Sequence, residues 1–129
     1  MQRTTRSIPR IHIFAALFLA SVLSIGCSSS HSKTGGGESV QVILDEYKIS
    51  MPTTFPAGQT TFNITNTGEH KHGFKIKGNG IEQELTSGLA SMESGELTAT
   101  LVAGTYEVSC PMLGHSLLGM HLTVIATPR

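Results

Sequence analysis

YEVSCPMLGHSLLGMHLTV, residues 106–124, joins two strand-like runs through one short loop. Apolar residues alternate with polar ones from Tyr106 to Cys110 and again from Met120 to Val124. Successive side chains of a strand point to opposite faces. This alternation therefore predicts that Cys110 ends one strand, and Met120 begins the next, on the same inward face. The loop between them starts and ends with a sulfur-bearing side chain that faces the interior of a β domain.

The loop contains a pattern of soft metal ligands, C-x4-H-x4-M, formed by Cys110, His115 and Met120. Two histidines and one cysteine in a trigonal plane, with a weak axial methionine, are the ligands of blue-copper electron-transfer sites. One histidine is missing from the loop, and the segment EHKHGF at residues 69–74 offers it. The combination of these residue types predicts a metal site.

His72 is the histidine that we expect to complete the site. It shares the parity of Phe74 in a strand predicted over residues 72–77, so its side chain should face inward. His70 has the same parity and remains an alternative ligand. His72 adjoins the strand directly and would be held more firmly, as a precise site requires. His121 has the opposite parity and is expected to face solvent.

Strand signals are frequent along residues 39–127, and helical periodicity is weak. Alternation is clear over residues 40–44, 60–66 and 97–101, and a slip in parity near Asp45 indicates a bulge or a bend. Several short strands separated by regular turn signals are typical of a sandwich of two sheets. The sequence therefore predicts an all-β domain with a Greek-key antiparallel β-sandwich fold.

The N-terminal part differs in character from the predicted domain. Residues 1–27 contain three arginines, an apolar run and Cys27, which resembles a bacterial lipoprotein signal in which Cys27 is acylated. Ser24 departs from that pattern, and a cleaved secretory signal or an uncleaved anchor are the alternatives. Residues 28–38 are a flexible Ser/Gly linker. We expect an exported protein, in the bacterial periplasm or on the cell surface, with a lipid anchor that holds it to a membrane.

Charge and cysteine content narrow the function. The chain has 129 residues, enough for one small domain. Beyond Cys27 it has six Lys and Arg against nine Asp and Glu, a net charge of −3. This charge argues against a nucleic-acid-binding protein, which would need a basic face. Cys110 is then the one cysteine of an exported domain, and it has no partner for a disulfide. Metal binding accounts for it.

The chain is similar to the cupredoxin family of plastocyanin and azurin. The segment HGFKI at residues 72–76 resembles the family's first ligand strand, and residues 104–120 resemble its ligand loop with the strand that leads to it. The two x4 spacings resemble auracyanin and rusticyanin more than the shorter loop of plastocyanin. The resemblance covers nearly all of residues 39–125 and implies a cupredoxin-like β-sandwich.

The resemblance implies one copper ion held by His72, Cys110 and His115, with Met120 as the weak axial ligand. It also implies one-electron transfer through the exposed edge of His115.

Two residues beside the cysteine ligand depart from the family pattern. Gly73 stands where the family often has an asparagine that braces the ligand loop, and Pro111 has no backbone N–H to donate. We expect the N–H of Gly73 to support the sulfur of Cys110 instead.

The predicted function is to carry single electrons between redox proteins. All the usual ligand positions are filled by the protein, which argues against an enzyme, because a catalytic metal site keeps one position open. Three leucines near His115 are candidates for an apolar docking patch for redox partners: Leu113, Leu117 and Leu118. We expect a monomer.

Three other functions are alternatives for a domain with these residues. A copper-binding or delivery protein would exchange its metal readily and would use Met112, which we expect to be exposed, together with His70 and His121. A zinc site is the second alternative, since zinc also accepts Cys and His ligands. A structural module that binds no metal is the third.

Overall fold

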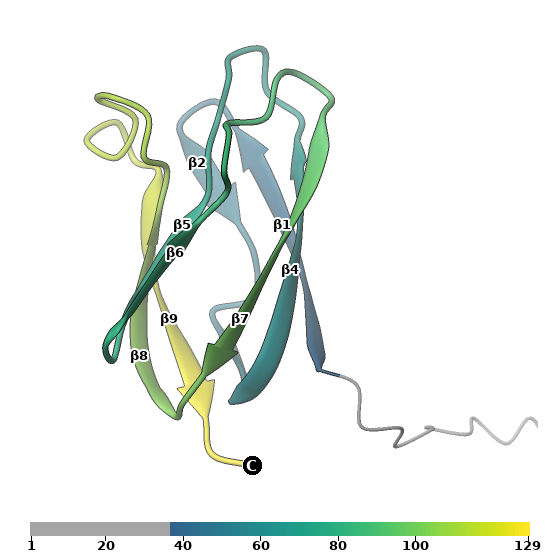
Figure 1. The fold of residues 1–129 in the computed structure, drawn as a ribbon. Helices are drawn as coiled ribbons and strands as arrows, with labels where there is room; N and C mark the ends of the chain where they lie inside the picture. The colour runs from purple at the N-terminus through teal and green to yellow at the C-terminus, as the bar shows by residue number, and fades with distance from the viewer. Residues whose placement is uncertain (1–36) are drawn as a thin grey trace, which may run out of the picture. The chain divides into compact units, whose positions relative to one another are not determined.

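Residues 37–129 are the part of the chain that the computed structural model describes (Figure 1). They form strands and turns, and none of them forms a helix long and apolar enough to cross a membrane. The strands are β1 (Glu38–Asp45), β2 (Lys48–Ser50), β3 (Thr54–Pro56), β4 (Gly58–Asn66), β5 (Lys75–Gly78), β6 (Ile81–Glu84), β7 (Ser94–Leu101), β8 (Gly104–Ser109) and β9 (His121–Thr127).

The predicted leader, residues 1–27, lies outside the described residues, and with it the expected lipidation site Cys27. The predicted linker, residues 28–38, also lies outside them, except for its last two residues. The second of these, Glu38, already pairs with Thr60 in the first sheet.

The strands form two sheets, and the predicted β-sandwich is confirmed. One sheet has the order β2-β1-β4-β7 and the other β3-β9-β8-β5-β6. Most neighbours are antiparallel, but β1 pairs with β4, and β3 with β9, in parallel. The chain enters the second sheet through β3 and then returns to the first, where β4 runs in the direction of β1. The sheets are therefore mixed.

The core lies between the sheets and follows the alternation of the sequence. β1 and β4 bury every second residue, and the same period appears in β8. Three phenylalanine rings connect the two layers: Phe62 packs against Phe55 and Phe74, with ring centroids 5.9 and 5.2 Å apart. Such aromatic contacts add to the stabilisation by buried apolar area.

The slip in parity near Asp45 is a tight turn, so of the two predicted alternatives the chain forms a bend and not a bulge. Asp45 pairs with Lys48 across the antiparallel strands β1 and β2, so Glu46 and Tyr47 form the loop of a hairpin. Tyr47 has φ of 56°, a left-handed conformation that L residues adopt at a cost. This turn reverses the chain and puts the Glu46 side chain at one end of the sandwich.

The strand expected from His72 begins three residues later, at Lys75. Its neighbour β8 ends at Ser109, opposite Lys75, so residues 72–74 have no partner in that ladder. The backbone of His72 instead forms a single bridge with Leu89: each N–H donates to the other's carbonyl, at 3.1 and 2.7 Å. His72 is therefore held by the loop between β6 and β7.

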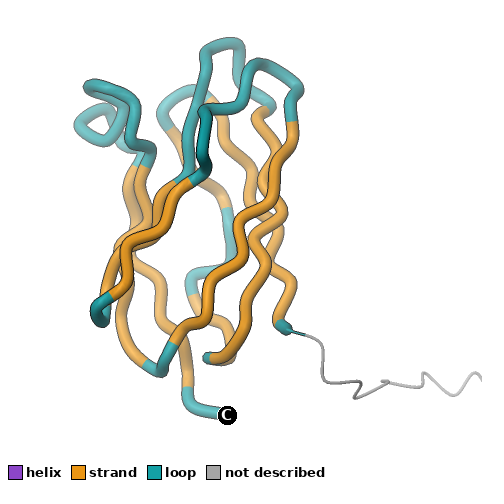
Figure 2. Tube along the Cα trace, in the orientation of Figure 1, coloured by secondary structure: helices purple, strands orange, loops and turns teal. Residues whose placement is uncertain are grey.

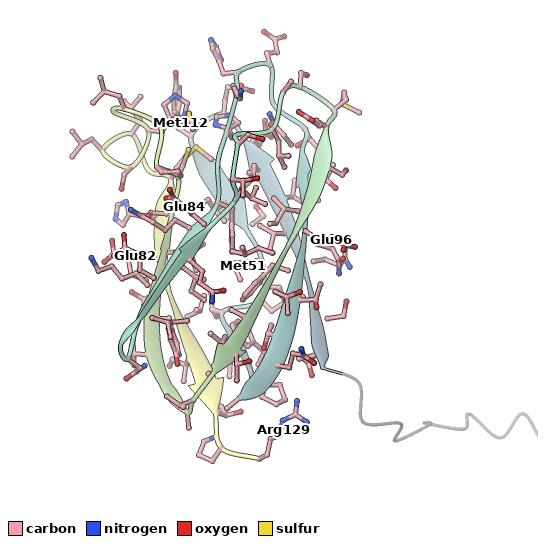
Figure 3. The ribbon with its side chains drawn as sticks, viewed as in Figure 1. Met51, Glu82, Glu84, Glu96, Met112 and Arg129 are labelled. Carbon is pink, nitrogen blue, oxygen red and sulfur yellow. The ribbon has the colours of Figure 1, made fainter. Side chains whose placement is uncertain are left out.

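Strand directions bring the candidate ligands to one end of the domain. β1, β4 and β8 end there, while β5 and β9 begin there, so the loops between them collect together (Figures 1 and 2). Figure 3 places Met112 at this end, whereas Arg129 lies at the other. The candidate ligands His72, Cys110, His115 and Met120 are all in or beside these loops.

Two neighbouring residues of β1 test the assignment of its faces. Leu44 is fully buried, whereas Ile43 is 39% exposed. We expect Leu44→Ala to lower the free energy of unfolding by about 2–5 kcal/mol through lost burial and a residual cavity. Ile43→Ala should change it by less than about 1 kcal/mol. Urea denaturation of both variants checks this, and equal losses would contradict the assignment.

Candidate metal centre

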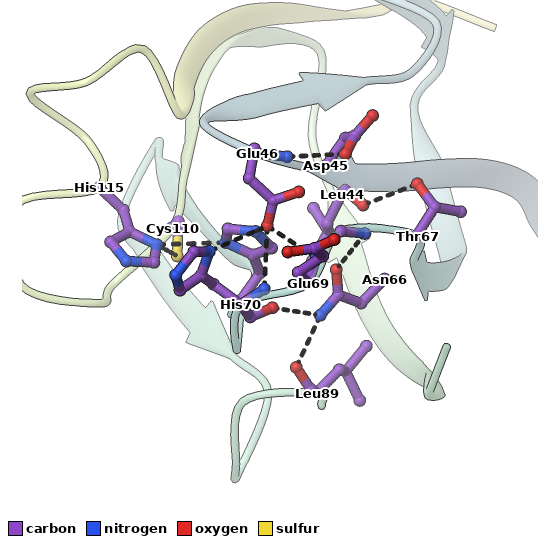
Figure 4. Close-up of polar contacts among 12 residues, drawn as sticks. Leu44, Asp45, Glu46, Asn66, Thr67, Glu69, His70, Leu89, Cys110 and His115 are labelled. Atoms are coloured by element: carbon purple, nitrogen blue, oxygen red, sulfur yellow. Dashed lines mark hydrogen bonds and ion pairs between the residues drawn. The ribbon is translucent and has the colours of Figure 1, made fainter. Parts of the chain in front are cut away.

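Three side chains converge at the end of the sandwich where the loops meet. The donor atoms offered by His72, Cys110 and His115 all lie within 4.8 Å of one another. The Nδ1 atoms of the two histidines are 3.1 Å apart, and the Sγ atom of Cys110 is 3.6 Å from Nδ1 of His115. Figure 4 shows Cys110 and His115 near Glu46 of the β1–β2 turn.

The spacing of these donors fits a single metal ion. Two atoms bonded to one ion through bonds of about 2.0–2.3 Å stand roughly 3.3–3.7 Å apart. The separations of 3.1 and 3.6 Å lie close to this range. Thiolate and imidazole together suit copper or zinc rather than magnesium or calcium. The arrangement can therefore hold a soft or borderline metal ion.

Backbone hydrogen bonds hold the loop that carries Cys110, His115 and Met120. The N–H of Cys110 donates to the carbonyl of Met120 at 3.0 Å, next to the last residue pair of β8 and β9. The N–H of Met120 donates to the carbonyl of His115 at 3.1 Å. Met120 is fully buried, as its parity predicted. The loop thus closes on itself, with its three candidate ligands linked through the backbone.

Asn66 holds the segment that leads to His72. It is fully buried at the end of β4, and its Nδ2 group donates to the carbonyls of His70 and Leu89, at 2.8 and 2.9 Å. Its Oδ1 atom accepts the N–H of Gly68 at 3.0 Å. A buried amide with all these partners stabilises one conformation of the segment, because any other would leave polar groups unpaired.

The backbone of Gly73 supports the sulfur of Cys110, as expected from the sequence. The Gly73 N–H donates to Sγ at 3.2 Å, and Cys110 is buried. A Cβ atom at Gly73 would lie 2.8 Å from Cδ of Pro111. The proline ring therefore occupies the space that a side chain at position 73 would need, and Gly73 is required for this close approach.

Electrostatics keep His115 available as a ligand. Burial lowers the pKa of His115, and the neighbouring His72 ring lowers it further. Desolvation has this sign because it disfavours the charged form of an imidazole. A neutral imidazole has one nitrogen lone pair free for a metal.

The carboxylate of Glu46 lies on the other side of His72, and His70 lies there too. Oε1 of Glu46 accepts the backbone N–H groups of Glu69 and His70, at 2.8 and 2.9 Å (Figure 4). The Nδ1–H of His70 contacts the same oxygen at 3.2 Å. These hydrogen bonds, above all the one from the backbone N–H of His70, lower the pKa of Glu46 to about 2. His70 is exposed and lies outside the three-residue donor cluster.

Tyr47 packs against both histidines of the cluster. Its ring stands edge-on to His115, with centroids 5.3 Å apart, and to His72 at 6.4 Å. The ligand loop approaches the same turn closely, because a Cβ at Gly119 would lie 2.9 Å from the Tyr47 carbonyl oxygen. The β1–β2 turn therefore forms one wall of the cluster.

The remaining predicted residues occupy the rim of the ligand loop. Met112 is half-buried and packs against the core, so the expectation that it is exposed is wrong; its side chain lies beside Gly73 and Pro111. His121 is exposed, as predicted. The candidate docking residues are all exposed: Leu113 by 101%, Leu117 by 93% and Leu118 by 60%.

Sequence analysis missed three residues that shape the site. Glu46 and Tyr47 lie beside the break in strand parity at Asp45, and Asn66 is the last residue of the predicted strand over residues 60–66. The end of this strand marks the position of the amide but not its partners. The two residues of the hairpin are separated from His72 in the sequence by three strands, β2, β3 and β4, and no local pattern indicates that they meet.

No protein-family model matches the sequence, and no curated protein shows significant sequence similarity to it. Solved structures do match. Auracyanin B has a TM-score of 0.60 and 22% identity, over 70% of this chain and 89% of that one. Dithionite-reduced auracyanin from the photosynthetic bacterium Roseiflexus castenholzii has a TM-score of 0.60 and 18% identity, over 72% of this chain and 100% of that one. The predicted cupredoxin-like fold is thereby confirmed.

The packing of Gly73 on Pro111 can be tested by a double-mutant cycle. Gly73→Ala should lower the free energy of unfolding by about 1–3 kcal/mol, because the added Cβ overlaps the proline ring. In a Pro111→Ala background the same change should cost much less, since Cδ and Cγ of the ring are gone. Thermal or urea unfolding of the four proteins measures the coupling. Equal costs in both backgrounds would show that the ring is not the obstacle.

Proposed function

We propose that this protein is a type 1 copper protein that carries single electrons between redox partners. The observation that carries the proposal is the convergence of two imidazole Nδ1 atoms and one thiol within 4.8 Å, on a cupredoxin-like fold. Met120, fully buried and bonded through its backbone to Cys110 and His115, is the candidate axial ligand. These four residues are the ligand set of blue-copper sites.

The chemistry of the donors favours copper and its redox cycle. Thiolate and thioether are soft ligands that select Cu(I), and imidazole also suits copper. Bound copper would supply one-electron chemistry by alternating between Cu(II) and Cu(I). The chain's own contribution is to hold the ligands: His72 by its bridge to Leu89, and Cys110 by Met120. Ligands fixed in this way need to move little when the charge changes.

The surface around His115 supports a role in transient encounters with redox partners. Three exposed leucines lie in the ligand loop on either side of His115, and exposed apolar patches commonly mark interaction sites. Weak electron-transfer complexes have small interfaces, so a few apolar side chains are enough to form the centre of one. We assign docking to Leu113, Leu117 and Leu118, in a protein that acts as a monomer.

The proposal includes a cellular location for the protein, which rests on the N-terminal sequence. The charged and apolar leader with Cys27 supports export and a lipid anchor, and the Ser/Gly linker supports a tethered domain. The protein would then act in the bacterial periplasm or at the cell surface.

The first test is a visible absorption spectrum of the purified protein after addition of Cu(II). We expect an intense blue band from the bond between the Cys110 thiolate and copper, one copper ion per chain, and reversible bleaching by a mild reductant. Cys110→Ser should abolish the band, because it removes the thiolate.

His70→Gln is the matched control for the spectrum. His70 is exposed and lies outside the donor cluster, so its replacement should leave the band unchanged. A colourless protein that binds no copper would refute the proposal. Rapid loss of copper to a chelator, without reversible redox cycling, would favour the copper-delivery function instead.

The docking patch can be tested through electron self-exchange between oxidised and reduced copies. Leu117→Lys should slow self-exchange by about tenfold, because it places like charges at the contact. The copper absorption should not change. Val102→Lys is the matched control: Val102 is likewise an exposed apolar residue, 60% exposed, but it lies at the other end of the sandwich, between β7 and β8. An equal rate in Leu117→Lys and wild type would remove the patch from the mechanism.

A further inference from the structure

One buried nitrogen of the candidate site has no hydrogen-bond partner within residues 37–129. It is Nε2 of His72, whose side chain is fully buried. The other ring nitrogen, Nδ1, faces Nδ1 of His115 at 3.1 Å. A neutral imidazole has a proton on one nitrogen and a lone pair on the other. If Nδ1 is to bind a metal, the proton must be on Nε2, where it needs an acceptor.

The acceptor that faces this nitrogen is Oε1 of Glu46, 3.5 Å away. This distance is slightly longer than a formed hydrogen bond, so a small shift of either group closes it. The carboxylate itself is firmly placed, because Oε1 accepts the N–H groups of Glu69 and His70. Gly68 permits this approach, since a Cβ there would lie 2.7 Å from the same oxygen.

We propose that Glu46 is a positioning residue for the metal ligand His72. Its carboxylate accepts a hydrogen bond from the Nε2–H group of His72, which selects the tautomer with a free Nδ1 lone pair. Its negative charge favours the more oxidised state of the bound metal. The inference rests on the proposed function, which it deepens by naming a residue that sets the copper potential.

The physical argument has two parts. Metal-bound histidines commonly donate their second N–H to a carboxylate or carbonyl, which fixes the ring and raises its basicity. A carboxylate also contributes a full negative charge, which stabilises Cu(II) more than Cu(I) and therefore lowers the reduction potential. The Glu46 side chain is 35% exposed, so solvent reduces this effect without removing it.

Glu46→Gln separates the charge from the hydrogen bond. All four contacts of the carboxylate use Oε1, so a glutamine carbonyl can accept them while its amide group takes the place of Oε2. We expect the folded protein to keep its blue copper site and its reduction potential to rise. A tenfold loss of Cu(II) affinity relative to Cu(I) corresponds to about 59 mV for a one-electron couple.

Two comparisons show whether the reduction potential depends on the charge of Glu46. His70→Gln alters the exposed partner of Glu46 but leaves the carboxylate beside His72, so its potential should equal that of wild type. A purely structural role of Glu46, as a brace for residues 68–70, predicts that Glu46→Gln also leaves the potential unchanged. An unchanged potential in Glu46→Gln would therefore overturn the electrostatic part of the proposal.

The metal-free protein supplies an independent readout. Nitrogen-15 NMR of the His72 ring should show the proton on Nε2 in wild type and in Glu46→Gln, and a mixture of tautomers in Glu46→Ala. A proton on Nδ1 in wild type, or the same tautomer in Glu46→Ala, would overturn the positioning role. These spectra need no copper, so failure of this inference is distinguishable from failure of the proposed function.

Discussion

The antiparallel pairing of β8 with β9 is the interaction on which the candidate site depends. The ladder runs from Gly104 opposite Ala126 to Ser109 opposite His121, and the bond from the N–H of Cys110 to Met120 continues it. These bonds bring together the two ends of the ligand loop, so the ladder offsets the entropy cost of closing it. Because strand side chains alternate, the same pairing turns both sulfur-bearing side chains into the core. The site is therefore an extension of the sheet.

His72 comes from the loop between β4 and β5, which joins the two sheets, and the core couples the two layers. Phe62 of the first sheet packs against Phe74, two residues after His72, while Leu89 and Asn66 hold the backbone on either side. The ligand positions are thus set by backbone bonds and aromatic packing. None of these contacts involves a metal, and ligands that are fixed in place by the fold suit the proposed electron carrier.

One loop serves two environments. Its ends, Cys110 and Met120, are buried, while Leu117 near its middle is almost fully exposed. Gly114 and Gly119, with φ of 82° and 125°, allow the tight turns that separate the two sides. A thiol kept away from solvent and an apolar rim presented to solvent are both needed for the proposed function. The short loop provides the buried thiol and the apolar rim because its backbone hydrogen bonds hold its middle residues at the surface, away from the core.

The sequence by itself determined the inward faces of β1, β4, β8 and β9 and the residue types of the site, because alternation with period two is a local property. It also indicated the Gly73 contact with Cys110, since Pro111 cannot donate. The tertiary structure decided the rest: the parallel pairing of β1 with β4, the late start of β5, and the approach of Glu46 and Tyr47 to His72. These depend on which loops meet at one end of the sandwich. Strand periodicity describes the faces of a strand, but it contains no information about the neighbours of a turn.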